Sequence, residues 1–140
     1  MPIVTFHLVE GRYPPERLDE LLERASTLYA RVLDSPLERV RAFVAGYPAE
    51  RVAVAGTRVS RGAQPAPYFE FLVLHGRPVA QRHALLAGFT DLLVELLDAP
   101  RALIRGRAVQ LEPDDWAIAG EPASATRRAE IQARAGAGSA

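Results

Sequence analysis

The sequence repeats itself at a spacing of 64 to 65 residues, and this repeat limits the possible folds more than any other feature. The matched pairs are Pro2 with Pro67, Gly11 with Gly76, Arg12 with Arg77, Asp34 with Asp98, Pro36 with Pro100, Arg41 with Arg105, and Gly56 with Gly120. At typical residue frequencies such agreement arises by chance about once in a million trials. The first copy has one extra residue around Pro14-Pro15. We therefore expect two copies of one small unit.

The pattern in each copy indicates a strand, a helix and a second strand. In the first copy, residues 3–9 are an apolar, β-rich run, and Pro14-Pro15-Glu16 is a signal for the start of a helix. Apolar residues then recur at the spacings that place one stripe on a helix. The stripe is Leu18, Leu21, Leu22, Ala25, Leu28, Tyr29, Val32 and Leu33, and all but Leu18 have an apolar counterpart 64 positions later. Residues 40–45 indicate the second strand, which Gly46 and Pro48 end.

This order predicts an α+β fold in which two tandem β-α-β units form one four-stranded sheet with two helices on one face. A helix that joins two strands of one sheet makes them parallel, by a right-handed crossover. We expect the first unit at 1–56, a linker at 57–66, the second unit at 67–120 and a C-terminal tail at 121–140. The tail is poor in large apolar residues, so we expect it to be partly disordered, with at most a short helix over 125–133.

The second face of such a sheet needs a cover. Large side chains such as Phe6, Phe43, Tyr68 and Phe71 lie in the predicted strands. We therefore expect other subunits to bury the face without helices, and the protein to be a homo-oligomer.

Composition excludes several functions. Seventeen basic and seventeen acidic residues give a formal net charge of zero, so we expect neither nucleic acid nor a membrane surface as a partner. The absence of cysteine excludes disulfides and thiol nucleophiles. The first residues do not resemble a signal peptide, and apolar runs such as 92–97 are too short to span a bilayer, so we expect a cytoplasmic protein.

The usual catalytic motifs are absent, which draws attention to the N-terminus. The chain has no GxSxG, Walker, GxGxxG or HExxH motif, and its three histidines lack the spacing of metal ligands. Pro2, however, becomes a free secondary amine if Met1 is removed. Such an amine can move a proton, and apolar surroundings and nearby arginines favour its neutral, basic form.

Four arginines at equivalent places of the repeat are the second candidate feature. Arg12 and Arg77 follow the first strand of each copy, and Arg41 and Arg105 lie in the second strand. Planar guanidinium groups bind carboxylates through two parallel hydrogen bonds. The pattern thus favours a small, carboxylate-bearing substrate.

These residues resemble the 4-oxalocrotonate tautomerase family of the tautomerase superfamily. The similarity rests on PIVTFHLVEGR, the following helix, Asp-Ser-Pro, the Val-Arg pair at 40–41 and VAVAG, and it extends to about residue 120. It implies β-α-β units with a catalytic amino-terminal proline, here in a fused arrangement, and an isomerase that needs no cofactor and no metal. In related aromatic degradation chemistry, the substrate would be a 2-hydroxydienoate or the enol of a 2-oxo acid.

The resemblance also assigns roles to individual residues. Pro2 matches the catalytic base, and Arg12, Arg41, Arg77 and Arg105 match the arginines that bind and polarise the substrate. Trp116 matches the aromatic residue that shields the proline, whereas Val52 occupies the equivalent place in the first copy.

Fusion leaves at most one proline amine per chain, because Pro67 is held in a peptide bond. We expect Arg77 of the same chain to lie near Pro2, while Arg41 or Arg105 could come from a neighbouring subunit. The family precedent for fused units is a trimer.

Two alternatives remain open from the sequence. The same scaffold could serve a decarboxylase, or a hydratase or dehalogenase of a three-carbon acid, for which Asp114 and Asp115 beside Trp116 are the nearest acidic candidates. It could also be a non-catalytic binding or assembly protein, as the substitution at Val52 suggests.

Overall fold

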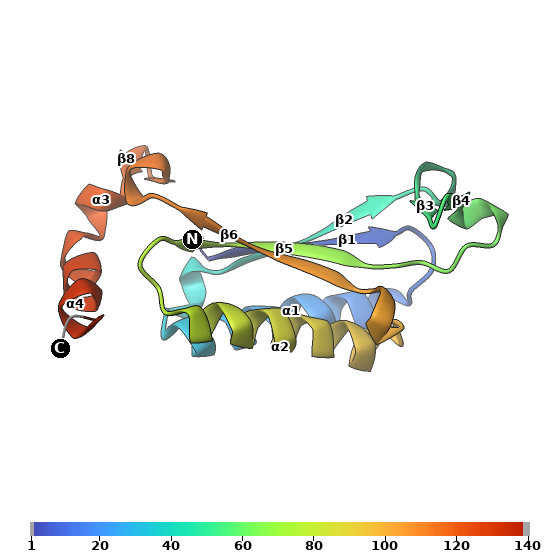
Figure 1. Cartoon of the computed structure of the whole chain (residues 1–140), viewed down its shortest axis with the longest axis horizontal. Coiled ribbons are helices and arrows are strands. Elements are labelled where there is room, and N and C mark those ends of the chain that lie inside the picture. Colours follow the sequence, from blue (N-terminus) through green and yellow to red (C-terminus); the bar gives the residue numbers. More distant parts are fainter. Residues whose placement is uncertain (1, 139–140) are drawn as a thin grey trace.

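The centre of the computed structural model, which describes residues 2–138, is a four-stranded sheet. Its strands are β1 (Ile3–Val9), β2 (Arg41–Tyr47), β5 (Tyr68–Leu74) and β6 (Arg105–Leu111), in the order β2-β1-β5-β6. The pairs β1/β2 and β5/β6 are parallel, and the central pair β1/β5 is antiparallel. Helices α1 (Pro15–Leu33) and α2 (Val79–Leu97) lie side by side on one face (Figure 1). The predicted fold class is confirmed.

The central strand pair shows how the two copies of the repeat are related. In the antiparallel register of β1 and β5, Thr5 faces Glu70, its own counterpart 65 positions later. An approximate twofold axis therefore passes between these two residues and exchanges the copies. As a result, β1 and β5 start at opposite ends of the sheet (Figure 1).

Both helices begin at a proline turn and end at an aspartate. Pro15 starts α1, where its fixed φ suits the first turn and its missing N–H is not needed. Asp34 and Asp98 end α1 and α2 with φ values of 49° and 52°, in the left-handed region. Aspartate tolerates this conformation better than most residues, so the repeated aspartates mark both helix ends.

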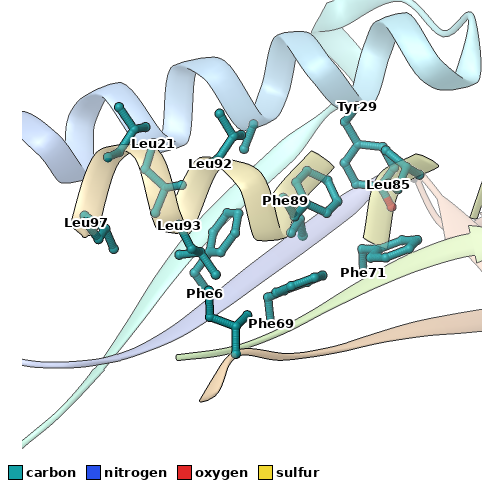
Figure 2. Close-up of a cluster of buried hydrophobic side chains, with 14 of the residues drawn as sticks. Phe6, Leu21, Tyr29, Phe69, Phe71, Leu85, Phe89, Leu92, Leu93 and Leu97 are labelled. Atoms are coloured by element: carbon teal, nitrogen blue, oxygen red, sulfur yellow. The ribbon is translucent and has the colours of Figure 1, made fainter. Parts of the chain in front are cut away.

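Aromatic rings fill the core between the sheet and the helices (Figure 2). Phe89 of α2 lies at the centre, with ring centroids 5.8 Å from Phe6, 5.7 Å from Phe69 and 5.4 Å from Phe71. Tyr29 of α1 is fully buried, and its hydroxyl donates to the carbonyl oxygens of Leu72 and, at 3.3 Å, Ile3. These contacts join both helices to the two central strands.

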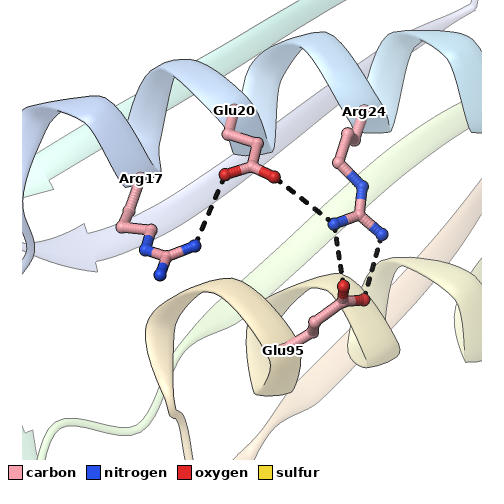
Figure 3. Close-up of polar contacts among 4 residues, drawn as sticks. All are labelled: Arg17, Glu20, Arg24 and Glu95. Atoms are coloured by element: carbon pink, nitrogen blue, oxygen red, sulfur yellow. Dashed lines mark hydrogen bonds and ion pairs between the residues drawn. The ribbon is translucent and has the colours of Figure 1, made fainter.

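An ion pair and a close backbone approach join the two helices to each other. Arg24 donates to both carboxylate oxygens of Glu95 at 2.9 and 3.0 Å, and Glu20 lies 3.6 Å from the same guanidinium (Figure 3). A Cβ on Gly88 of α2 would come within 2.6 Å of the Leu28 side chain on α1. The glycine therefore permits this separation of the helices.

The face of the sheet without helices corrects one expectation from the sequence. Phe6 and Phe71 point toward the helices and are fully buried, so they do not belong to the second face. Alternation along a strand places Phe43 and Tyr68 on that face, where Phe43 is 51% exposed. The face without helices therefore carries fewer large apolar side chains than the sequence predicts.

A short hairpin follows the outer strand of each copy. The hairpins are formed by β3 (Ala53–Val54) with β4 (Thr57–Arg58), and by β7 (Ala117–Ile118) with β8 (Glu121–Pro122). Their two-residue turns, Ala55-Gly56 and Ala119-Gly120, have positive φ at both positions. This is the turn geometry that fits the twist of a hairpin.

The C-terminal tail contains two helices. Helix α3 (Ala123–Thr126) is followed by α4 (Arg128–Gly138), which is longer than the helix expected over 125–133. Glu130 of α4 forms an ion pair with Arg39, and this contact ties the tail to the rest of the chain. The last two residues of the tail lie outside the described residues. Within residues 2–138, no helix could cross a membrane.

Candidate functional site

Pro2 lies at the start of the central strand β1, at the end of the sheet where the C-terminal helices also lie (Figure 1). Its side chain is fully buried, and its carbonyl oxygen accepts a hydrogen bond of 2.9 Å from the Arg41 backbone N–H. Ile3 pairs with Leu72, so the register continued by one residue brings Pro2 opposite Val73. We call this the Pro2 end.

Two cavities of about 30 and 310 Å³ occupy the Pro2 end. Trp116 and Arg39 line both of them. The smaller cavity is also lined by Leu33, Ser35, Val73, Leu74, Arg77, Ile118, Arg127, Glu130 and Arg134, and the larger by Ile3, Glu38, Arg41, Ala117, Ile118, Ala119 and Arg127. Arginines therefore make up most of the polar lining.

Arg77 enters the smaller cavity from the loop between β5 and α2. It is half-buried and donates to the Leu33 carbonyl oxygen at 2.8 Å and to Gln81 Oε1 at 3.4 Å. Burial, and then the positive charge of Arg134, lower the pKa of the Arg77 guanidinium from its usual value. A cation held in this way gains from an anion placed beside it.

Arg41 lies at the start of the edge strand β2, next to Ile3 in the register. It is exposed, and its guanidinium donates to the backbone carbonyls of Glu38 at 2.9 Å and Val40 at 3.2 Å. Arg41 also lines the larger cavity of the Pro2 end.

Trp116 brings an unpaired donor into the same region. It follows a short turn that contains Asp114 and Asp115, both of them exposed. The indole Nε1 is buried and has no hydrogen-bond partner within residues 2–138. Together with the arginines, this N–H makes a pocket that is rich in donors and suits a ligand rich in acceptors.

The opposite end of the sheet holds the counterpart residues around Pro67. Pro67 is buried, and its carbonyl oxygen accepts from the Arg105 backbone N–H at 3.1 Å, as Pro2 does from Arg41. A cavity of about 450 Å³ lies there and is lined by Val52 and Pro67. The rest of its lining is His7, Leu8, Val9, Tyr13, Tyr47, Arg51, Ala53, Pro65, Ala66 and Tyr68. Arg12 donates to the Val59 carbonyl oxygen at 3.5 Å.

The structure thus divides the predicted site residues between the two ends. Arg41, Arg77 and Trp116 lie at the Pro2 end of the same chain. Arg12, Arg105 and Val52 accompany Pro67 instead, because the twofold axis carries each copy's residues to the other end. Only the first group can serve Pro2 within one chain.

Comparison with known proteins identifies the family of the chain. Residues 2–62 match the family model described as "Tautomerase enzyme". A 2-hydroxymuconate tautomerase from Pseudomonas sp. (strain CF600) is 34% identical over 61 residues, which make up 44% of this chain and 95% of that protein. The chain belongs to the tautomerase family.

Solved structures extend the similarity to both copies of the repeat. Native fused 4-OT is 27% identical with a TM-score of 0.83, covering 90% of this chain and 99% of that one. Pt0534 inactivated by 2-oxo-3-pentynoate is 27% identical with a TM-score of 0.81, covering 89% and 98%. An asymmetric trimer, F6 fused 4-OT, is 25% identical with a TM-score of 0.80, covering 89% and 98%. The chain is thus similar over both copies to fused 4-OT proteins.

Four further charged residues that line the smaller cavity were not predicted from the sequence: Arg39, Arg127, Glu130 and Arg134. The repeat did not single out Arg39, because its counterpart in the second copy is Leu103 rather than an arginine. The other three are spaced by three and four residues, which puts them on one face of a helix. This spacing is the sequence feature that could have predicted a charged helix face in the tail.

Proposed function

We propose that this tautomerase is a cofactor-free isomerase that uses the amine of Pro2, after removal of Met1, as its general base. The amine would take a proton from the hydroxyl of a 2-hydroxydienoate, or of the enol of a 2-oxo acid, and a proton would be delivered to carbon. The observation that carries the proposal is the grouping of Arg77, Arg41 and Trp116 at the end of the sheet where β1 begins.

The surroundings of Pro2 suit a basic amine at neutral pH. The proline is buried, and burial disfavours the charged form of an amine. Arginines line the adjacent cavities, and nearby positive charge disfavours the charged form further. Both effects leave the amine neutral and able to accept a proton.

The arginines would hold the substrate and stabilise the charge that develops on it. We assign Arg77 of the same chain to the carboxylate or the dienolate oxygen, because it is half-buried and lies beside Val73. Arg41, or Arg105 of a neighbouring subunit, would bind the remaining oxygens. Such preorganised donors stabilise the charge that develops on the dienolate oxygen in the transition state more than they stabilise the uncharged hydroxyl of the bound substrate. Trp116 would wall the pocket.

Assembly would complete the pocket. Phe43 at 51% and Tyr47 at 38% are exposed on strand β2, and Leu37 and Val79 are exposed elsewhere. Exposed aromatic side chains on an uncovered sheet favour contact with further copies of the chain. Together with the trimer of the similar F6 fused 4-OT, this supports a homotrimer.

The test combines the mass of the N-terminus with chemical labelling. The natively expressed protein is incubated with 2-oxo-3-pentynoate, an electrophilic 2-oxo acid, and the modified residue is located by mass spectrometry. We expect Met1 to be absent and one label per chain on the Pro2 nitrogen. A retained Met1, or labelling spread over other residues, would count against the proposal.

A further inference from the structure

Arg39 and Glu130 form a two-point contact at the Pro2 end. Arg39 donates from Nη1 to Glu130 Oε2 at 3.1 Å and from Nη2 to Oε1 at 3.0 Å. This is the parallel geometry in which arginine binds a free carboxylate. Glu130 therefore occupies, on Arg39, the position that a ligand carboxylate would take.

Arg39 is well placed to bind a ligand, because its guanidinium lines both cavities of the Pro2 end. The other arginines there are engaged differently: Arg77 donates to Leu33 and Gln81, and Arg41 donates to two backbone carbonyls. Arg39 alone among these three is held by a carboxylate through both terminal nitrogens. Displacement of that carboxylate would free its whole hydrogen-bonding edge.

Of the two cavities at the Pro2 end, the smaller is the one that α4 lines, through Glu130 and Arg134. At about 30 Å³ it offers the space of roughly one water molecule, too little for a three-carbon acid. The larger cavity, of about 310 Å³, is lined by Arg39 and Trp116 but not by α4. At the Pro67 end, counterparts of residues from both linings surround one cavity of about 450 Å³. There, Val52 replaces Trp116, Leu103 replaces Arg39, and no second copy of α4 exists within residues 2–138. The contact with α4 thus accompanies a nearly closed cavity on one side of Arg39 and Trp116, and the larger cavity lies beside it.

We propose that Arg39 is a carboxylate-binding residue of the Pro2 pocket and that Glu130 is its internal substitute, which a carboxylate ligand displaces as α4 moves away. The location of the pocket rests on the proposed function, but the exchange of carboxylates on Arg39 does not require Pro2 to react. Because a ligand must compete with Glu130, its apparent affinity is lower than the affinity of the open pocket.

The solvent exposure and charges around Arg39 and Glu130 favour the exchange of Glu130 for a ligand carboxylate. The side chains of Arg39 and Glu130 are 29% and 44% exposed, so water can solvate both partners during the exchange. The hydrogen bond from Arg39 lowers the pKa of Glu130, which therefore stays ionised at neutral pH. After displacement, Glu130 keeps the nearby positive charges of Arg127 and Arg134.

The test uses the single tryptophan, Trp116, as a reporter, because it lines both cavities with Arg39. The full-length protein is titrated with pyruvate, and the fluorescence change gives an apparent Kd. We expect Glu130→Gln to lower that Kd about two- to fivefold, as removal of an exposed ion pair allows. Arg39→Gln should weaken binding at least about tenfold, since a charge-assisted pair is lost. Glu121→Gln, an exposed carboxylate of the same tail, serves as the matched control and should leave the Kd unchanged.

Two further measurements separate this proposal from a structural role and from the proposed catalysis. Pyruvate should increase amide hydrogen exchange in α4 of the wild type, a change that simple stabilisation by ligand would not cause. Arg39→Lys, which keeps the charge but loses the planar fork, should bind with a Kd between those of wild type and Arg39→Gln. The titration is repeated in Pro2→Ala, where the effect of Glu130→Gln should persist even if Pro2 does not catalyse. Equal Kd values for wild type and Glu130→Gln, unchanged binding by Arg39→Gln, or no binding of pyruvate by any variant would each overturn the proposal.

Discussion

Pro2 and Pro67 occupy equivalent positions at opposite ends of the two central strands, and each accepts a backbone hydrogen bond from an arginine of the adjoining strand. Their chemistry differs because Pro67 lies within the chain. An internal proline nitrogen is an amide and has no basicity, whereas an N-terminal one is a secondary amine. The pseudosymmetric fold thus has pockets at two equivalent positions, and only the pocket beside Pro2 can contain a proline that acts as a base.

Substitution at the two prolines should therefore have unequal effects. We expect Pro2→Ala to lower kcat/KM for an enolised 2-oxo acid by about 10²-fold or more, the usual contribution of a positioned acid or base. Met1 can still be removed before alanine, so the variant keeps an N-terminal amine of different basicity. The measurement is the initial rate of ketonisation, followed by absorbance.

The matched control is Pro67→Ala, which should change kcat/KM by less than about twofold. Its peptide nitrogen takes no part in proton transfer. Similar losses in both variants would indicate a shared structural effect and would contradict the role of Pro2.

Arg77 and Arg12 are a second pair of counterparts that the structure separates. Arg77 lies at the Pro2 end, and Arg12 accompanies Pro67. We expect Arg77→Gln to lower kcat/KM about 10- to 100-fold, the loss of one charge-assisted hydrogen bond. Arg12→Gln should have little effect in the same assay. An equal loss in Arg12→Gln would show that Arg12 also acts on the substrate and would contradict the assignment of this role to Arg77 rather than Arg12.

The repeat made the sheet and the paired helices predictable. Matched proline, glycine and aspartate positions marked the same turns in both copies, and the apolar stripe marked the helix face. The antiparallel contact of β1 with β5 is one of two ways in which equivalent strands can pair, and the repeat alone does not choose between them. Given this pairing, the start of each copy lies beside the end of the other's first strand, and Arg77 comes to the Pro2 end.

The contribution of the tail could not be predicted in the same way. Glu130 and Arg39 are 91 residues apart, and Arg39 has no counterpart in the second copy. Helix α4 has few large apolar residues, so its composition indicated partial disorder. Its position depends on ion pairs with a distant arginine, and sequence spacing within a helix carries no information about such a partner.

Phe69 and Gly106 make a packing prediction that uses the repeat. They face each other across β5 and β6, and a Cβ on Gly106 would lie 2.2 Å from Phe69 Cζ. The counterpart pair is Val4 with Ala42. Val4 is smaller than Phe69, and Ala42 is larger than Gly106. We expect Gly106→Ala to destabilise the fold by about 1–3 kcal/mol through overpacking.

Equilibrium unfolding in urea at fixed protein concentration measures the effect. Phe69→Val combined with Gly106→Ala recreates the counterpart pair, so the double variant should lose at least about 1 kcal/mol less than the sum of the two single losses. Gly46→Ala is the control, because the added methyl meets the flexible side chain of Glu10, which can move aside. Additive single effects would contradict the proposed clash.

Tyr29 predicts how stability depends on alkaline pH. Burial raises the pKa of its phenol far above the ordinary value of 10.0, so the native protein keeps this proton where the unfolded chain loses it. Stability from this group is complete below pH 10 and falls as the pH rises further, by up to about 1.4 kcal/mol per pH unit. Tyr29→Phe should be less stable than wild type at pH 8 by about 1 kcal/mol, because the bonds to Leu72 and Ile3 are lost. Its stability should then decline less steeply between pH 10 and about 11.5 in urea unfolding, whereas Tyr47→Phe should keep the wild-type decline. Parallel declines in Tyr29→Phe and wild type would show that other groups govern alkaline unfolding.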